Sequence, residues 1–138
     1  MIVVDSNVIV YSVLNSDQTA DAEAVLRKDA AWVAPALWLS EVRNVLMLYV
    51  RRGTLSVVNA LEIVEAAIEK VQTSDDSLTS ERILQLADSS GCTAYDCEFV
   101  VTAESLNVPL ITADKKVLAA FPNIAISMSD FVSNRSNV

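Results

Sequence analysis

Two acidic residues occupy positions at which a carboxylate can do chemistry. Asp5 directly follows the β-branched run Ile2–Val4, and Asp114 ends the segment Pro109-Leu110-Ile111-Thr112-Ala113-Asp114. Short apolar runs of this kind predict β-strands. In open α/β sheets the carboxyl ends of the strands form the edge at which ligands bind. We therefore expect both carboxylates to lie at one edge of a sheet.

Two further acids lie in predicted helices among apolar neighbours. Glu41 belongs to the predicted helix Pro35–Arg52, on an apolar stripe with no cation three or four residues away. Asp96 lies in the segment Cys92–Ile111, which contains no Lys or Arg. An ionised carboxylate against apolar neighbours is costly unless something pairs with it. Both positions therefore predict a binding role.

Each acid also has a plain structural explanation. Asp5 and Asp114 both precede predicted helices, where Asp is a favoured N-cap. Asp96 stands three residues after Thr93, which is the spacing of a capping box. Glu41 can be a partly exposed residue whose carboxylate reaches water. The functional interpretation depends on all four acids occurring together without local cations.

Four converging carboxylates point to a metal site, because close carboxylates repel one another and a hard divalent cation removes that conflict. The chain has no histidine, which excludes Ser-His-Asp and Cys-His catalysis and imidazole zinc sites. It has only two glycines, so neither a P-loop nor a dinucleotide-binding loop is present. An all-carboxylate set fits Mg²⁺ or Mn²⁺, as one or two ions.

The composition indicates one folded domain. The chain has 138 residues, 52% of them apolar, and a formal net charge of −8. No apolar run is long enough to span a membrane, and the two cysteines, Cys92 and Cys97, do not form a CxxC motif. We expect a cytoplasmic protein without a membrane partner. The negative charge argues against a broad basic surface, so a polyanionic substrate would be held locally.

Strand-like and helical segments alternate, which predicts an α/β fold with a central, mainly parallel sheet of four or five strands between helices. The domain is expected to cover residues 1–132, followed by a polar, frayed tail at 133–138. The predicted strands are Ile2–Val4, Trp32–Ala34, Val71–Thr73, Leu110–Thr112 and Ile124–Ile126. The predicted helices are Ser6–Leu14, Thr19–Lys28, Pro35–Arg52, Val57–Glu69, Ser77–Ser89, Ala94–Leu106 and Lys115–Ala120.

Four motifs in this order resemble those of the PIN-domain nucleases, and the size and order are similar to the VapC-type toxins of toxin–antitoxin pairs. The resemblance extends from Ile2 to about Val132. The motifs are Val4-Asp5-Ser6-Asn7-Val8-Ile9-Val10, Leu39-Ser40-Glu41-Val42, Thr93-Ala94-Tyr95-Asp96 and Leu110-Ile111-Thr112-Ala113-Asp114.

The resemblance implies a three-layer α/β/α domain with endoribonuclease activity and inhibition by an antitoxin protein. By position, it makes metal ligands of Asp5, Glu41, Asp96 and Asp114. Asn7 and Thr112 fall where the family has small polar residues beside its site. Helix capping and a hydrogen bond at the strand end explain these two residues as well as a catalytic role does. Cations near the motifs are limited to Arg43, Lys115 and Lys116. These three side chains are candidates for contacts to substrate phosphates, or they are ordinary solvated surface residues.

Two other hypotheses remain open. The segment Ala36–Val50 is apolar on nearly every side, which fits a helix buried between the sheet and another helix. It also fits a groove for an antitoxin or a homodimer surface, and hence a catalytically weak scaffold that acts through protein association. A phospho-acceptor receiver domain also has acids at its strand ends. It requires paired acids after the first strand, however, and Ser6-Asn7 does not supply them.

Overall fold

The computed structural model describes residues 1–75 and 78–134. Its centre is one five-stranded sheet in which every neighbouring pair is parallel, in the order β3-β2-β1-β4-β5. The strands are β1 (Ile2–Val4), β2 (Trp32–Ala34), β3 (Val71–Thr73), β4 (Leu110–Ile111) and β5 (Ala125–Ile126). The predicted α/β class with a parallel sheet is confirmed.

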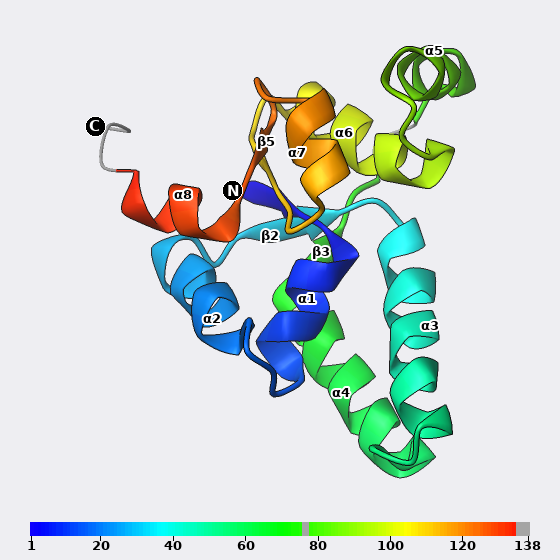
Figure 1. Ribbon diagram of the computed structural model, residues 1–138, viewed down its shortest axis with the longest axis vertical. Coiled ribbons are helices and arrows are strands. Elements are labelled where there is room, and N and C mark those ends of the chain that lie inside the picture. The colour runs from blue at the N-terminus through cyan, green and yellow to red at the C-terminus, as the bar shows by residue number, and fades with distance from the viewer. Residues whose placement is uncertain (76–77, 135–138) are drawn as a thin grey trace.

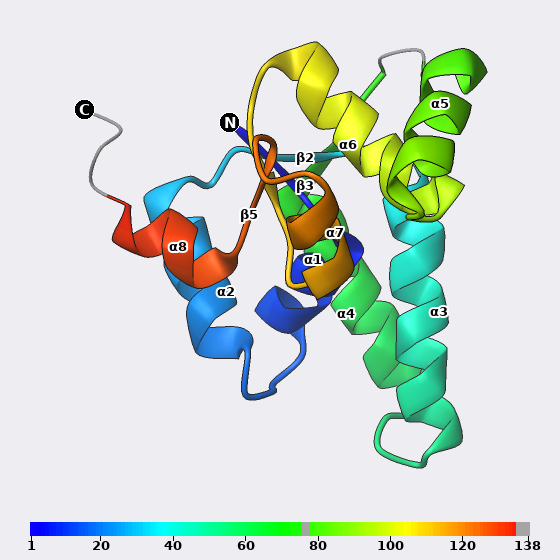
Figure 2. The same cartoon turned by 45° about the horizontal axis from the view of Figure 1, so that its top comes forward.

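Helices cover both faces of this sheet. Figure 2 shows α6 on one side of the strands and α1 and α4 on the other. Figure 1 shows α3 and α4 side by side as a hairpin that extends away from the strands. The helices are α1 (Ser6–Val13), α2 (Thr19–Lys28), α3 (Leu37–Arg51), α4 (Val57–Lys70), α5 (Ser80–Ser90), α6 (Ala94–Leu106), α7 (Lys115–Ala120) and α8 (Met128–Ser133).

The central strands consist of β-branched and other large apolar residues because both faces of the sheet are covered. In β1 the three side chains are at most 1% exposed, and in β4 Leu110 and Ile111 are 1% and 0% exposed. Val3 pairs with Leu110 and Val4 with Ile111. The strand order reverses between β1 and β4, and in open α/β sheets ligands bind beside such a reversal, at the carboxyl ends of the strands.

Most predicted boundaries agree with the structure to within one or two residues. β4 ends at Ile111, so Thr112 lies just beyond the strand. The helix predicted from Ser77 begins at Ser80, and Ser77 itself lies outside the described residues. The helix α8 was not predicted. The predicted tail at 133–138 begins at the last residue of α8 and lies outside the described residues beyond Asn134.

Several helices begin at a side chain that caps them. The side-chain oxygens of Ser56, Thr79, Thr93 and Ser127 each accept a backbone N–H at the start of a helix. Gly91 ends α5 with a φ of 72°, a conformation that only glycine adopts without strain. No helix in the described residues is both long and apolar enough to cross a membrane.

Candidate metal centre

Asp5 lies at the end of the most deeply buried strand. Its backbone N–H donates to the carbonyl of Ile111 at 3.0 Å, which continues the pairing of β1 with β4. The Thr112 hydroxyl donates to Asp5 Oδ2 at 2.6 Å and accepts the backbone N–H of Asp114 at 3.0 Å. Thr112 is completely buried. One threonine therefore fixes Asp5 and links it to the segment that carries Asp114.

Glu41 lies beside the buried face of α3 rather than on it. That face consists of Trp38, Val42 and Leu46, each at most 2% exposed, whereas Glu41 is half-buried. The hydroxyl of Ser6 donates to Glu41 Oε1 at 2.8 Å. The predicted alternative of a partly exposed glutamate is thus correct about its exposure, but the carboxylate has a specific partner.

Sequence reasoning did not single out Ser6, which is only 4% exposed. It follows Asp5 directly and starts α1, so its side chain reaches α3 while Asp5 ends β1. A polar residue next to a candidate acid, at the start of an otherwise apolar helix, is a signal that a sequence can provide. Its partner, 35 residues away, is not.

Asp96 and Asp114 both have the structural roles considered above. Thr93 and Asp96 form a capping box: Thr93 Oγ1 accepts the Asp96 N–H at 3.0 Å, and Asp96 Oδ2 accepts the Thr93 N–H at 3.3 Å. Asp114 Oδ1 caps α7 by accepting the N–H groups of Lys116 and Val117 at 2.8 and 3.2 Å. In each carboxylate these bonds occupy one oxygen, so capping leaves the second free for a ligand.

The charges of these acids affect one another. Burial raises the pKa of Asp5 above the ordinary aspartate value of 3.8, and the negative charges of Asp96 and Asp114 raise it further. The Thr112 hydrogen bond and the nearby backbone N–H of Asn7 lower the pKa of Asp5 but do not reverse the shift. Ionisation of Asp5 is therefore less favourable than that of an ordinary aspartate unless a cation lies nearby.

The pKa of Glu41 is also raised. Burial is the main cause that raises its pKa above the ordinary value of 4.5, and the hydrogen bond from Ser6 opposes it. The charges of Asp5, Asp96 and Glu98 add to the rise. Glu98, on α6, is thus a further acid close enough to act on Glu41.

The chemistry of this acid cluster, which we define as Asp5, Glu41, Asp96 and Asp114, fits a hard divalent cation. It offers carboxylate oxygens only, and it gathers negative charge that a cation would offset. Within residues 1–75 and 78–134, no group of three or more His, Cys, Asp or Glu side chains could hold a metal ion as it stands. Asp96 and Asp114 are turned toward the backbone groups that they cap.

The remaining candidates differ in where they lie. Asn7 is exposed, and only its backbone N–H acts on Asp5. Lys115 and Lys116 are exposed and begin α7 directly after Asp114. Arg43 is exposed on α3 and lines a groove between α3 and α4 rather than the pocket at Glu41. The two lysines are therefore better placed than Arg43 beside the acid cluster.

The groove between α3 and α4, hereafter the α3–α4 groove, is a cavity of about 430 Å³. It is lined by Arg43, Leu46, Met47, Val57, Ala60, Leu61, Val64, Glu65 and Ile68. Val57 is 65% exposed, Leu61 57% and Ile68 49%. In α3 itself, Trp38, Val42 and Leu46 are buried, as a helix packed between the sheet and another helix requires, whereas Leu48 is 45% exposed.

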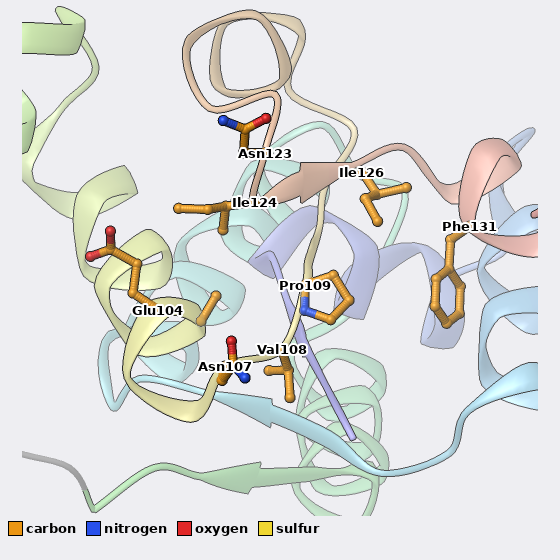
Figure 3. Close-up of a pocket in the computed structure, with 9 residues that line it drawn as sticks. Glu104, Asn107, Val108, Pro109, Asn123, Ile124, Ile126 and Phe131 are labelled. Atoms are coloured by element: carbon orange, nitrogen blue, oxygen red, sulfur yellow. The ribbon is translucent and has the colours of Figure 1, made fainter. Parts of the chain in front are cut away.

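A larger cavity of about 760 Å³ lies away from the acid cluster. It is bounded by the end of α6, the approach to β4, β5 and α8 (Figure 3). Its apolar lining includes Val108, Pro109, Ile124, Ile126 and Phe131. None of the four clustered acids lines it, so its size is no guide to the chemistry of this chain.

Comparison with known proteins agrees with this architecture. The model of the PIN domain family matches residues 2–124. Among solved structures, the fold is similar to the crystal structure of PAE2754 from Pyrobaculum aerophilum, with a TM-score of 0.76 and 21% sequence identity. That match covers 94% of this chain and 90% of the other. No curated protein matches the chain.

Proposed function

Because this chain belongs to the PIN domain family, whose members are generally metal-dependent nucleases, we propose that it is an endoribonuclease that hydrolyses RNA phosphodiester bonds. The observation that carries the proposal is the partly exposed Asp5 at the end of β1, with a raised pKa and three more acids close by. Carboxylates whose pKa is shifted by burial and by neighbouring charges are frequent at functional sites. Asp5 follows β1 and Asp114 follows β4, the two strands between which the strand order reverses, and ligands of open α/β sheets bind at such a point.

The cation in this proposal is Mg²⁺ or Mn²⁺, as one or two ions, held by the acid cluster. When bound, a divalent cation supplies charge that stabilises the attacked phosphate and lowers the pKa of a water molecule. The chain's own part is to position the carboxylates. Thr112 orients Asp5 and Ser6 orients Glu41, each through a short hydrogen bond to one oxygen. Residues that hold metal ligands in this way commonly determine metal affinity.

The charge of the chain favours a locally held substrate. A net charge of −8 repels a polyanion, so the RNA backbone should be contacted at few phosphates. Lys115 and Lys116 are exposed beside Asp114 and are the proposed phosphate contacts. Arg43 is a weaker candidate because it lines the α3–α4 groove.

Replacing Asp5 with Asn tests this proposal. The amide keeps the shape of the side chain but removes a charged ligand, so RNA cleavage with Mg²⁺ or Mn²⁺ should fall by more than about 100-fold, beyond the 10–100-fold typical of residues that only orient ligands. EDTA should abolish cleavage by the wild type. Cleavage is measured on labelled RNA by gel electrophoresis, and folding by circular dichroism.

Asp88→Asn is the matched control, since Asp88 is an exposed aspartate on α5. Its cleavage rate should equal that of the wild type. Cleavage that persists in Asp5→Asn, or that EDTA does not diminish, would refute the proposed metal-dependent mechanism.

The biological role that we propose is that of a cytoplasmic toxin inhibited by an antitoxin protein. Support comes from the four ordered motifs, which resemble those of VapC-type toxins. Induction of the wild type should arrest bacterial growth, whereas Asp5→Asn should not. Equal growth in the two cases would contradict the toxin role but not the nuclease activity.

A second candidate function is a catalytically weak scaffold that acts through protein association. The observation in its favour is the α3–α4 groove, in which Val57, Leu61 and Ile68 are exposed. The Asp5→Asn experiment separates the two candidates, because a scaffold would lose nothing when Asp5 is changed.

A further inference from the structure

A small pocket opens directly beside Glu41. It has a volume of about 280 Å³, close to the lower limit of about 300 Å³ for small-molecule sites. One helix supplies most of its lining and α6 supplies one aromatic residue. The lining residues are Leu37, Ser40, Glu41, Asn44, Val45 and Tyr95. Because Glu41 is one wall, anything in this pocket lies next to the acid cluster.

Tyr95 is the unusual member of this lining. It is 61% exposed, and its hydroxyl has no hydrogen-bond partner among the described residues. It is the second residue of α6, between the two members of the Thr93–Asp96 capping box. The capping box fixes the backbone on both sides of it. An aromatic ring is therefore presented to solvent from a rigid position next to a candidate metal ligand.

The charges around the pocket disfavour a phosphate there but do not oppose a neutral ligand. Glu41 forms part of the wall, and the charges of Asp5, Asp96 and Glu98 all act on it. A negatively charged group in this place would be repelled. A flat, neutral group with polar edges would not be, and it would gain from stacking on Tyr95.

The polar lining residues suit such a group. Ser40 and Asn44 are exposed on α3, one turn apart, on either side of Glu41 in the sequence. A hydroxyl and an amide together offer both donors and acceptors. The edges of nucleobases carry both, and unpaired bases in RNA are typically bound by stacking on aromatic side chains and by hydrogen bonds to their edges.

We propose that this pocket binds one unpaired nucleobase of the RNA, with Tyr95 as the stacking platform and Ser40 and Asn44 as contacts to the edge of the base. The proposal rests on the proposed ribonuclease function and adds to it. A base held here places the adjoining phosphate at the acid cluster. Because a protein with a negative net charge cannot bind many phosphates, a contact to a base supplies part of its affinity for RNA.

The test measures binding rather than cleavage. Fluorescence anisotropy follows a short fluorescein-labelled single-stranded RNA of mixed sequence with the Asp5→Asn protein, which does not cut it. In that background Tyr95→Ala should weaken binding roughly 5- to 150-fold, the equivalent of about 1–3 kcal/mol for one stacked base. Tyr95→Phe keeps the ring and should bind as the parent does. Leu84→Ala, at a residue 63% exposed on α5, is the control and should change nothing.

A second RNA without bases identifies the group that is bound. An oligomer of abasic ribose phosphates should bind the parent and Tyr95→Ala equally weakly. The pocket proposal would be overturned if intact RNA bound Tyr95→Ala as tightly as it binds the parent protein. It would also be overturned if Tyr95→Ala weakened the binding of abasic RNA as much as it weakens the binding of intact RNA. A wild type that neither binds nor cuts RNA would instead overturn the ribonuclease function. A wild type that cuts RNA, together with an unaffected Tyr95→Ala, would overturn the pocket proposal alone.

Discussion

At the scale of single residues, two hydroxyls organise the candidate metal centre. Thr112 bonds Asp5 at 2.6 Å and Ser6 bonds Glu41 at 2.8 Å. Each bond occupies one oxygen of a carboxylate whose pKa is already raised by burial. Hydrogen bonds of this type fix a ligand's orientation before a cation binds. The acids are thus pre-positioned by residues that are themselves buried.

Thr112→Val should reveal this positioning role. Valine has nearly the same shape but cannot donate to Asp5 or accept from Asp114, so the affinity for Mn²⁺ should fall roughly 10- to 100-fold. Isothermal titration calorimetry measures it. Thr102→Val is a matched control, since Thr102 is also completely buried but bonds a backbone carbonyl within α6. Equal Mn²⁺ affinities in the two variants would show that Thr112 is only a core residue.

The raised pKa of Asp5 predicts how stability depends on pH. Because the folded state binds its proton more tightly than the unfolded state, Asp5 favours folding at low pH. This contribution is lost as the pH rises from the ordinary value of 3.8 through the higher folded-state pKa. In the metal-free protein, the free energy of unfolding of Asp5→Asn should therefore increase relative to the wild type as the pH rises toward about 7. Urea unfolding at several pH values measures the difference, and parallel curves would contradict the prediction.

At the scale of secondary-structure elements, helix starts and candidate ligands coincide. Asp96 is the third residue of α6 and Asp114 is the N-cap of α7. The structural explanation considered for each acid is therefore correct, yet it does not exclude a binding role. Capping uses one carboxylate oxygen and holds the side chain at a defined place. The helix starts act as supports for the acid cluster.

Thr93→Ala tests whether the start of α6 supports the site. Loss of the N-cap should lower the free energy of unfolding by about 1 kcal/mol. It should also weaken Mn²⁺ binding, because the backbone N–H of Asp96 loses its acceptor and the first turn of α6, which positions the Asp96 carboxylate, is held less firmly. Ser56→Ala is the matched control: Ser56 caps α4 with a bond of 3.0 Å, in a helix that carries none of the four acids. It should destabilise the protein by a similar amount without affecting Mn²⁺ affinity. Unchanged Mn²⁺ binding in Thr93→Ala would limit the capping box to folding.

At the scale of the whole molecule, the sheet order brings distant segments together. The reversal between β1 and β4 places the segments that follow these strands beside each other, although Asp5 and Thr112 are 107 residues apart. The hairpin of α3 and α4 contributes differently at its two ends. The start of α3 supplies Glu41 and the pocket residues, whereas the α3–α4 groove is a separate apolar surface.

The α3–α4 groove is the surface that we propose for a homodimer. It is mainly apolar and carries one cation and one acid, Arg43 and Glu65, which could pair across a twofold axis between two copies. Leu61→Glu places a charge in the exposed part of the groove and should convert a dimer to a monomer, as measured by light scattering coupled to size-exclusion chromatography. Val132→Glu, at a residue 38% exposed on α8, is the control. A wild type that is monomeric at high concentration would refute the homodimer.

The sequence by itself determined most of the secondary structure. Strands β1, β2 and β3 and helices α2, α6 and α7 have the predicted bounds. Short apolar runs, capping residues and glycines act within one or two turns of backbone, so they can be recognised without knowledge of the fold. The helix α8 was missed although Ser127 and Asp130 have capping spacing. A helix of six residues is not stable alone, and α8 depends on packing against α2.

Tertiary structure alone decided which residues meet. The order of the strands, the bond between Ser6 and Glu41, and the pocket between α3 and Tyr95 join segments that are far apart in the chain. The sequence identified four acids, but their partners and the effect of Glu98 depend on how the helices pack on the sheet. The sequence determines which chemical groups are present. The distances between these groups, which make them a site, are fixed only when the packed core holds the helices and strands against one another.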